Sequence, residues 1–427
     1  MTKTDSAPEI QADLIIEGAA EVVTCAGASQ GDVGAIPDGA IACTGGTIVF
    51  VGTGADCGRR VALNPGGRRL DARGGVILPG FVDPHTHVPF AGWRDGEFEK
   101  RLAGATYLEI AAAGGGILST VRATRAAGLE TLTTLVLERL DAMLLCGTTT
   151  IEAKSGYGLS LDAELTILRA LARASSHPVE IVPTLLGAHV VGPEFRDGRR
   201  AEYVRLVAEE MIPRAAAEGL ARFCDVFVDE GAFTLDEART ILEAAKRHGL
   251  GLRVHAEQLR HTGAAALAAS LGAASVDHLE QATHEDVAAL AASGTVAILL
   301  PGAAYFLRET SRPPARAFIE AGVPVALATD FNPGSSPCHA MPPILNLACV
   351  LFGMTPDEAI VGATRQAARS LGLEGRLGTL ETGKQADLAV WDLPGRKHLA
   401  YRLGLLPCRA VVKRGRVVAE NGRLSAA

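Results

Sequence analysis

Two histidines, His85 and His87, follow an apolar segment and are separated by a single residue. In an extended chain the side chains of residues i and i+2 point to the same side, so both imidazoles can face one centre. His255 and Asp330 end two further apolar segments and would complete a set of three imidazoles and one carboxylate. Such a set suits Zn²⁺ or Fe²⁺. With one coordination position left open, the metal would lower the pKa of a bound water to about 7 and supply hydroxide near neutral pH.

Eight apolar segments that could form strands must position these residues. They alternate with helical stretches rich in Ala, Leu and Glu, such as residues 129–145 and 161–175. Near-continuous apolar strands joined by helices indicate a parallel sheet covered on both faces, and eight such units match a (β/α)8 TIM barrel, whose usual size is ~250 residues. An open doubly wound sheet is the alternative that periodicity leaves open. The eight segments are residues 74–85, 147–155, 179–189, 224–230, 252–257, 274–280, 294–301 and 324–330.

Polar side chains end seven of the eight segments. In a barrel the C-terminal ends of all strands meet on one face, where barrel enzymes have their active sites. This coincidence favours the barrel over the open sheet and predicts that the polar side chains lie at one mouth. They are His85 and His87 (first segment), Lys154 (second), His189 (third), Glu230 (fourth), His255 (fifth), His278 (sixth) and Asp330 (eighth).

The two ends of the chain differ from its middle. Residues 12–76 form short segments with β-branched residues, separated by turn residues, and similar segments return near the C-terminus, as in ADLAVWDL and PCRAVVKRGRVVAENGR. Such pieces are typical of a small sheet domain, and neither end has enough strands to be stable alone. We therefore expect one small β-sandwich domain built from both termini. Residues 1–76 would form its N-terminal part, 77–372 the barrel and 373–427 its C-terminal part.

The composition of the 427 residues limits the possible partners. With 48% hydrophobic and 21% charged residues, it is that of a globular enzyme rather than a disordered protein. A formal net charge of −7, without basic stretches interleaved with aromatics, argues against nucleic-acid binding. No apolar run reaches the ~20 residues of a membrane helix, and the N-terminal MTKTDSAPEIQADL lacks the apolar core of a signal peptide. Eight scattered cysteines without a Cys-x-x-Cys pair fit a reducing compartment, so we expect a cytoplasmic protein.

Several motifs resemble the amidohydrolase superfamily of metal-dependent hydrolases. LPGFVDPHTH and ALATDFNPG lie at the two ends of the expected barrel, and LGTLETGKQADLAVWDL lies where the chain returns to the sandwich. Finer motifs are similar to those of members that open an imidazolone ring carrying a propionate, in histidine degradation. They are FAGWRDGEFEKRLAGATYLEIAAAGGGILSTVRATR, IEAKSGYGL, LLGAH, VHAEQL, DHLE, LLPGAAYFLRE and ATDFNPGSSP.

The resemblance implies hydrolysis of a cyclic amide carbon–nitrogen bond in 4-imidazolone-5-propanoate, which gives N-formimidoyl-L-glutamate. It also implies that His278 lies near the metal, and it suggests a homodimer. The metal ligands carried over by motif are His85, His87, His255 and Asp330. The positions that would hold the small-molecule substrate or product are Arg94, Tyr157, His189, Gln258, Asn332, Gly334 and Ser335.

Three of these residues are the catalytic candidates. Asp330 is suited to take a proton from the attacking water and to pass it to the leaving nitrogen. The metal and His278 would stabilise the developing oxyanion. Gln258 has both a donor and an acceptor for the ring nitrogens.

The propionate calls for positive charge and hydrogen-bond donors. Arg94 offers a fork of donors that fits a carboxylate bidentately, a role that lysine fills less well. Tyr157 and His189 would add further donors to the same carboxylate.

One metal ion per chain is expected. Binuclear relatives bridge two metals with a carboxylated lysine on the fourth strand, whereas the fourth segment here, CDVFVDEG, has no lysine. Lys154 ends the second segment, and a buried ion pair with Glu152 or Glu230 is its expected role. Zn²⁺, Fe²⁺ and Fe³⁺ stay open because three imidazoles and a carboxylate accept each of them. The roles of Glu230, Glu257 and His339 are open as well.

Two other functions are kept as alternatives. A deaminase of the same superfamily would release ammonia from a purine- or pyrimidine-like ring, and such a substrate would give Arg94, Tyr157 and His189 no carboxylate to hold. A catalytically inactive homologue that serves as a binding subunit would usually lack a metal ligand, yet every ligand position is filled here.

Overall fold

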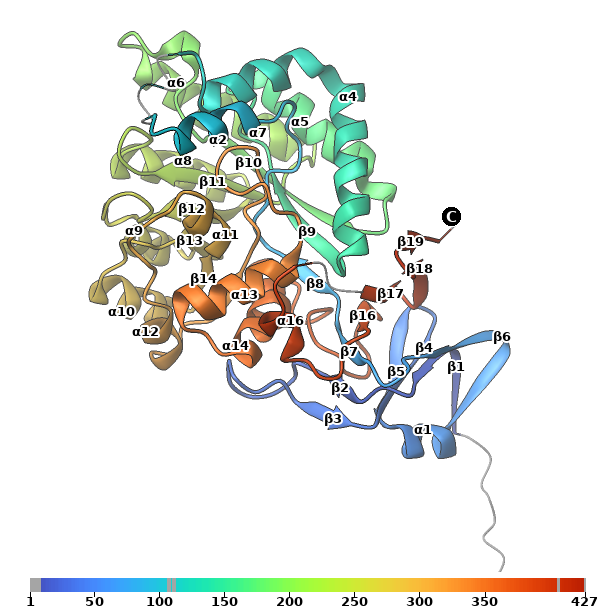
Figure 1. The fold of residues 1–427 in the computed structure, drawn as a ribbon. Coiled ribbons are helices and arrows are strands. Elements are labelled where there is room, and N and C mark those ends of the chain that lie inside the picture. Colours follow the sequence, from blue (N-terminus) through green and yellow to red (C-terminus); the bar gives the residue numbers. More distant parts are fainter. Residues whose placement is uncertain (1–8, 106–108, 110–112, 405–407, 426–427) are drawn as a thin grey trace, which may run out of the picture.

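A parallel eight-stranded barrel forms the body of the protein in this computed structural model (Figure 1). The structure describes residues 9–105, 109, 113–404 and 408–425. Each barrel strand pairs in parallel with the next one along the chain, so the predicted (β/α)8 fold is confirmed, and the doubly wound sheet is excluded by the sequential strand order. The strands are β8 (Phe81–Asp83), β9 (Thr148–Lys154), β10 (Glu180–Ala188), β11 (Phe223–Val228), β12 (Gly251–Ala256), β13 (Ser275–His278), β14 (Val296–Leu299) and β15 (Val325–Leu327).

The barrel closes between its first and last strands, near their C-terminal ends. The Asp330 amide donates a hydrogen bond to the His85 carbonyl (3.0 Å). Below this bond the Asp83 carboxylate accepts hydrogen bonds from the Thr329 amide (3.1 Å) and hydroxyl (2.6 Å). The closure therefore brings the His-x-His segment next to Asp330, although the two lie far apart in the sequence.

Helices cover the outside of the barrel (Figure 1). α8 begins with a capping box between Thr234 and Glu237. Its buried face carries Ala238, Ile241 and Ala245, at the spacing of an amphipathic helix. Within the described part of the chain, no helix combines the length and the apolar character needed to cross a membrane. Among the described residues, α1 (Gly54–Arg60) packs instead against the sandwich strands. The other described helices are α2 (Asp95–Leu102), α4 (Ile117–Leu145), α5 (Leu161–Arg173), η1 (Ala174–Ser176), η2 (Pro193–Phe195), α6 (Arg200–Leu206), η3 (Val207–Met211), α7 (Ile212–Ala217), α8 (Leu235–Arg247), α9 (Ala264–Leu271), α10 (His284–Ser293), α11 (Pro301–Phe306), α12 (Ala315–Glu320), α13 (Met341–Phe352), α14 (Pro356–Val361), η4 (Gly362–Gln366), α15 (Ala367–Ser370) and α16 (His398–Tyr401).

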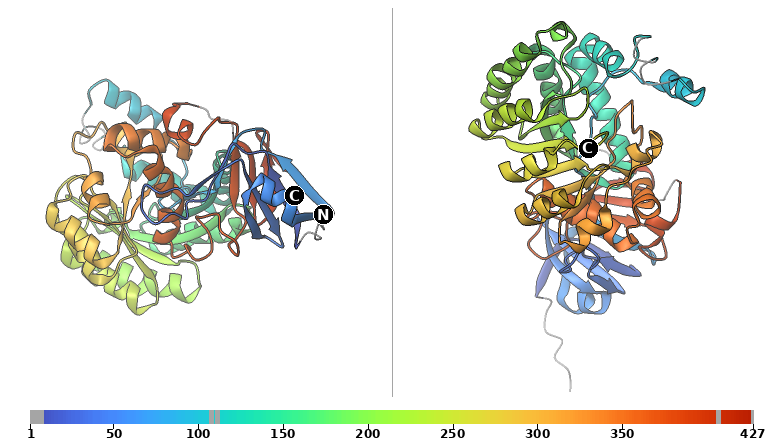
Figure 2. Two further views of the ribbon diagram at one scale, coloured as in Figure 1. Left: turned by 90° about the horizontal axis from the view of Figure 1, so that it is seen from below. Right: turned by 90° about the vertical axis from the view of Figure 1, so that its left-hand side faces the viewer.

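A β-sandwich with strands from both ends of the chain lies beside the barrel (Figures 1 and 2). One sheet has the order β5-β4-β1-β6 and the other the order β19-β18-β17-β16-β7-β2-β3. The C-terminal strand β16 pairs with the N-terminal β7, and Leu14, Ile41, Ile77 and Leu388 share one core between the sheets. The predicted sandwich is therefore confirmed, while the domain limits at residues 76 and 372 stay a prediction. The strands are β1 (Ile10–Glu17), β2 (Glu21–Val23), β3 (Ala35–Pro37), β4 (Gly39–Thr44), β5 (Thr47–Thr53), β6 (Val61–Asp71), β7 (Val76–Pro79), β16 (Leu388–Trp391), β17 (Cys408–Lys413), β18 (Arg416–Glu420) and β19 (Arg423–Leu424).

The first predicted strand segment, residues 74–85, is two strands in the structure. β7 belongs to the sandwich and β8 begins the barrel, with Gly80 between them. At Gly80 a Cβ atom would lie 2.3 Å from Thr149 Cγ2, so the chain changes sheets where only glycine fits. The apolar pattern does not reveal this change, because β7 and β8 are both buried throughout. The Gly-rich segment at 111–125 lies partly outside the described residues.

Candidate metal centre and substrate pocket

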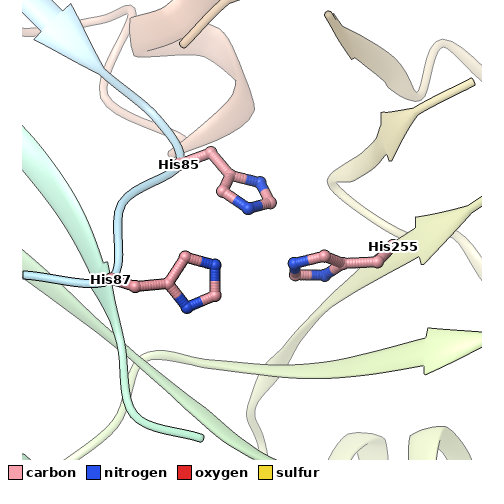
Figure 3. Close-up of side chains that lie close together, drawn as sticks. All are labelled: His85, His87 and His255. Atoms are coloured by element: carbon pink, nitrogen blue, oxygen red, sulfur yellow. The ribbon is translucent and has the colours of Figure 1, made fainter. Parts of the chain in front are cut away.

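Three histidine rings converge at the C-terminal mouth of the barrel (Figure 3). His85 and His87 follow β8 and flank Thr86, whose backbone bridges to Phe331 just past β15. With Thr86 held in this pairing, its two neighbours point to the same side. His255 comes from β12. One ring nitrogen of each histidine lies within 4.8 Å of one from each of the others, so the structure brings the His-x-His pair and His255 together.

These histidines and Asp330 make a donor set that fits a metal ion. The Nε2 atoms of His85 and His255 are buried and lack a hydrogen-bond partner among the described residues. Asp330 Oδ1 lies 3.5 Å from His85 Nε2 and 3.5 Å from His87 Nε2. Buried polar atoms without partners are costly, and a cation at this point would satisfy them. Three imidazoles and one carboxylate are ligands that Zn²⁺ and Fe²⁺ accept.

Two carboxylates behind the histidines orient the rings. His85 Nδ1 donates to Asp277 Oδ2 (2.6 Å), and His255 Nδ1 donates to Asp225 Oδ1 (3.1 Å). Because an ionised carboxylate only accepts, each Nδ1 carries the hydrogen and each Nε2 presents its lone pair to the centre. Burial lowers the pKa of His85 well below its ordinary value, so the ring stays neutral, as a metal ligand must be. Carboxylates of this kind usually stand behind metal-binding histidines.

Asp330 and His278 face the cluster with shifted proton affinities. Burial raises the pKa of Asp330 to about 6, against the opposing charge of His278. Burial alone would lower the pKa of His278, but Glu280, 3.6 Å away, and Asp330 raise it above its ordinary value. The His278 ring lies 5.9 Å from the His85 ring. Both His278 (φ 81°) and Asp330 (φ 51°) adopt the left-handed backbone region, which is uncommon for residues with side chains and clusters at active sites.

Lys154 lies fully buried at the end of β9. Its Nζ donates to Glu152 Oε1 and to Asp225 Oδ2, at 2.8 Å each. The expected ion pair with Glu152 is therefore confirmed. Glu230 instead pairs with Arg260 (3.1 Å), and both side chains are exposed. Glu230 does not join the buried polar side chains at the mouth, because its side chain is exposed and is held by Arg260.

The loop after β12 holds Glu257 and Gln258. Glu257 is buried and accepts hydrogen bonds from the Thr262 and Ala265 amides, so it fastens this loop. Gln258 is half-buried beside it. His339 lies half-buried in the loop after β15. Its ring packs against the Phe331 ring of the same loop, with 5.8 Å between the ring centres.

Arg94 stands directly before α2 and reaches the loop after β15. Its Nε donates to Glu97 Oε2 (2.9 Å), which leaves Nη1 and Nη2 as a fork. Glu97 Oε1 accepts from the Gly116 amide (2.8 Å) and the Ser119 hydroxyl (3.2 Å), so the start of α4 holds the guanidinium through Glu97. The fork lies against Gly334, where a Cβ atom would come within 2.1 Å of Arg94 Nη1. Arg94 and Gly334 are therefore neighbours in space.

Asn332 folds the loop that follows Asp330. Its Nδ2 donates to the Asp330 carbonyl (2.6 Å) and to the Ser335 hydroxyl (2.8 Å). Its Oδ1 accepts from the amides of Gly334 and Ser335, at 2.8 Å each. The Ser335 hydroxyl in turn donates to Asp330 Oδ2 (3.3 Å). The Asn332 side chain is thus used within the loop, where it positions Asp330, Gly334 and Ser335.

Tyr157 and His189 lie beside His87. The His189 ring stacks on that of His87 at 5.5 Å, and the Tyr157 ring lies 5.8 Å from that of His87. His189 Nδ1 donates to the Gly156 carbonyl (3.1 Å), because a carbonyl only accepts. Burial lowers the pKa of His189 to about 3, so the ring is neutral near pH 7. In this state Nε2 is an acceptor.

Several residues that support the site were missing from the sequence interpretation. Asp225 and Asp277 orient two histidines, Arg253 lies beside Asp277 (3.6 Å), and Glu97 holds Arg94. A signal was present for three of them, since a charged residue inside an apolar strand, as in CDVFV, LRVHA and SVDH, is rarely buried without a paired charge. Glu97 carried no such signal, because it lies on a polar helix with no buried residue.

Comparison with known proteins gives full-length relatives. An imidazolonepropionase from Symbiobacterium thermophilum is 51% identical over 419 residues, which cover 96% of this chain and 98% of the relative. An imidazolonepropionase from Caulobacter vibrioides is 51% identical over 397 residues, 93% of this chain and 98% of the relative. An imidazolonepropionase from Geobacillus kaustophilus is 46% identical over 421 residues, which cover 96% of this chain and 99% of the relative.

Solved structures share the fold at lower identity. An adenosine deaminase from Xanthomonas campestris with bound zinc matches with a TM-score of 0.74 and 21% identity, over 98% of this chain and 96% of the other. An atrazine chlorohydrolase from Arthrobacter aurescens complexed with zinc and atraton matches with a TM-score of 0.71 and 18% identity, over 97% of each chain. A model of the amidohydrolase family matches residues 76–418, from β7 through the whole barrel into β18. The chain therefore belongs to the amidohydrolase family of metal-dependent hydrolases.

Proposed function

We propose that this chain is an imidazolonepropionase, which opens the ring of 4-imidazolone-5-propanoate by hydrolysis of its cyclic amide carbon–nitrogen bond and yields N-formimidoyl-L-glutamate. The observation that carries the proposal is 51% identity to a relative of that name over 96% of the chain. Two features of the site support it. A donor set for a metal lies at the mouth of the barrel. The guanidinium of Arg94, whose Nη1 and Nη2 have no hydrogen bond to the described residues, adjoins the loop that follows Asp330.

One metal ion per chain is proposed, with His85, His87, His255 and Asp330 as its ligands. When bound, the metal supplies a Lewis acid that lowers the pKa of a water molecule towards neutrality. β11 carries no lysine, and Lys154 is held in ion pairs on another strand, so a lysine bridge between two metals has no support. Zn²⁺ and Fe²⁺ or Fe³⁺ all suit this donor set, and metal analysis of the purified protein decides among them.

Asp330 and His278 are the proposed proton-handling residues. Asp330 takes a proton from the attacking water and returns it to the leaving ring nitrogen. Burial by itself raises the pKa of Asp330, which makes its carboxylate a better proton acceptor than an exposed one. His278, whose pKa is raised, donates a hydrogen bond to the developing oxyanion. Gln258 offers a donor and an acceptor to the ring nitrogens.

The remaining residues would hold the propionate and the ring. Arg94 presents its Nη1 and Nη2 fork to the carboxylate. Burial raises the pKa of Tyr157 above its ordinary value, so its hydroxyl keeps the proton that it would donate to the same group. His189 was expected to be a second donor, but its Nδ1 hydrogen is used by the Gly156 carbonyl. We therefore assign His189 Nε2 as an acceptor for a ring N–H.

An ultraviolet assay of freshly made imidazolonepropionate tests this function. We expect the ring absorbance to disappear, one formimidoylglutamate to form per ring, and no ammonia to be released. A chelator should stop the reaction and added metal should restore it. Ammonia release from a purine or pyrimidine, without turnover of the imidazolone, would favour the deaminase. A folded, metal-free protein without turnover would favour the inactive homologue.

Replacing Gly334 with alanine tests the position of the Arg94 fork. The backbone of Gly334 lies outside the left-handed region, so alanine fits the chain, but its Cβ would displace Arg94 Nη1. Loss of one charged hydrogen bond predicts a rise in KM of about tenfold with little change in Tm. Gly375→Ala is the control, because a Cβ there meets no atom within 4 Å. Equal KM values for Gly334→Ala and the wild type would contradict the assigned carboxylate contact.

A cytoplasmic location and a homodimeric state are proposed as well. The first is supported by the eight cysteines, all of which carry free thiols. The second is supported by large apolar side chains that are exposed on two neighbouring helices, Val350 of α13 (71%) and Tyr401 of α16 (79%).

A further inference from the structure

A buried lysine that takes no part in the proposed reaction lies behind the metal centre. Lys154 is 0% exposed, as are Glu152, Asp225 and Asp277 around it. Its Nζ lies 2.8 Å from Glu152 Oε1, 2.8 Å from Asp225 Oδ2 and 3.6 Å from Asp277 Oδ2. Burying an ammonium costs folding free energy unless opposite charges lie close to it. The three carboxylates around Lys154 supply these charges.

Two of these carboxylates connect Lys154 to the histidines. Asp225 uses Oδ2 for Lys154 and Oδ1 for His255 Nδ1 (3.1 Å). Asp277 Oδ2 accepts from His85 Nδ1 (2.6 Å) and also faces Lys154. A single aspartate therefore separates Lys154 from His255, and another separates it from His85. These two histidines come from different parts of the barrel.

Arg253 is the second buried cation, but it is anchored elsewhere. Its Nη2 donates to the Pro84 carbonyl (2.6 Å), and its Nη1 donates to the Ser370 carbonyl (3.2 Å). Its distances to Asp277 and Glu152 are 3.6 Å and 3.7 Å. It is the cross-strand partner of Asp225 in the β11–β12 pairing, but no ion pair joins the two side chains in the described structure. Lys154 is thus the cation in close contact with the carboxylate behind His255.

We infer that Lys154 is a positioning residue for the metal centre: by holding Asp225 and drawing in Asp277, it keeps His255 and His85 aimed at the metal. The inference rests on the proposed function, because it needs a metal at the histidine cluster. Without the ammonium, the three buried carboxylates would repel one another, and Arg253 is the cation that would remain beside two of them in the described structure. Asp225 would also lose the contact that fixes its second oxygen. The two histidines would then lose their fixed ring orientation. Loss of a carboxylate behind a ligand weakens metal binding by about 10- to 100-fold, and Lys154 acts through two such carboxylates.

Metal affinity, rather than turnover, is the readout that tests this inference. The full chain is stripped of metal, and Zn²⁺ is titrated in the presence of a competing chromogenic chelator. We expect Lys154→Met to weaken Zn²⁺ binding by about 10- to 100-fold. The absorption bands of bound Co²⁺, measured in parallel, should also change, because the ligand geometry changes.

Two further variants separate positioning from the general cost of losing a buried lysine. Lys413 is also buried and pairs with Asp387 (2.6 Å), at the junction of sandwich and barrel, so Lys413→Met should lose thermal stability yet keep the wild-type Zn²⁺ affinity. The double variant Lys154→Met/Glu152→Gln removes one cation and one carboxylate and so keeps the net charge of the cluster. We expect it to fold better than Lys154→Met, while its Zn²⁺ affinity stays weak because Asp225 is still released.

The outcomes are distinguishable. Wild-type Zn²⁺ affinity in Lys154→Met, or its recovery in the double variant, would overturn the inference, as would an equal loss in Lys413→Met. If Lys154→Met does not fold, the double variant alone decides. A wild-type protein that binds no metal would instead overturn the proposed function.

Discussion

Replacing Asp330 with asparagine is expected to lower kcat by about 10²–10⁴-fold, the usual contribution of a general acid–base group. The amide keeps the shape of the side chain and can still accept from the Ser335 hydroxyl, which lies 3.3 Å from Oδ2 in the wild type. It cannot take up a proton and return it to the leaving nitrogen. The same change removes the negative charge 3.5 Å from His85 Nε2 and His87 Nε2, so metal affinity should fall too.

The assay must therefore be run with saturating metal, with the bound metal measured in each sample. A matched control is Asp387→Asn, another buried carboxylate, which lies at the junction of sandwich and barrel and pairs with Lys413. This control should lower stability and leave kcat near the wild-type value. If metal-loaded Asp330→Asn keeps a kcat within tenfold of the wild type, Asp330 is not the proton shuttle.

Replacing Arg94 with methionine is expected to raise KM by about 10²-fold and to change kcat little. Two charged hydrogen bonds to one carboxylate would be lost, at about 1.5–3 kcal/mol each before solvent replaces them. The Arg94 side chain is 15% exposed, so water offsets part of this loss. Because the propionate is remote from the bond that breaks, its contact stabilises substrate and transition state alike, which predicts an effect on KM rather than on kcat.

A substrate analogue with a propionamide in place of the propionate completes the test. The wild type should lose affinity for the analogue, whereas Arg94→Met should treat acid and amide nearly equally. A neighbouring control is Arg101→Met, because Arg101 donates to the Gly334 carbonyl (3.1 Å) and stacks on Phe306 without taking part in the proposed fork. An unchanged KM in Arg94→Met would support a substrate without a carboxylate, as for the deaminase.

Local patterns were enough for the fold class and for much of the site. Apolar strands that alternate with helices predicted the barrel, and the His-x-His spacing predicted two rings on one side. The same patterns failed at Gly80, where a continuous apolar run changes sheets, and at Glu230, whose side chain is exposed and pairs with Arg260. Periodicity reports burial, and burial is the same on both sides of a change of sheet.

The sequence by itself determined which donors this protein has and that parallel strands would present them at one mouth. Residue type and local spacing suffice for that, since the ends of barrel strands always meet on one face. Only the tertiary structure decided that Asp277 stands behind His85, 192 residues away in the sequence, and that Gly334 leaves room for Arg94. Such partners depend on how the closed barrel brings distant segments into contact, which no local pattern of residues contains.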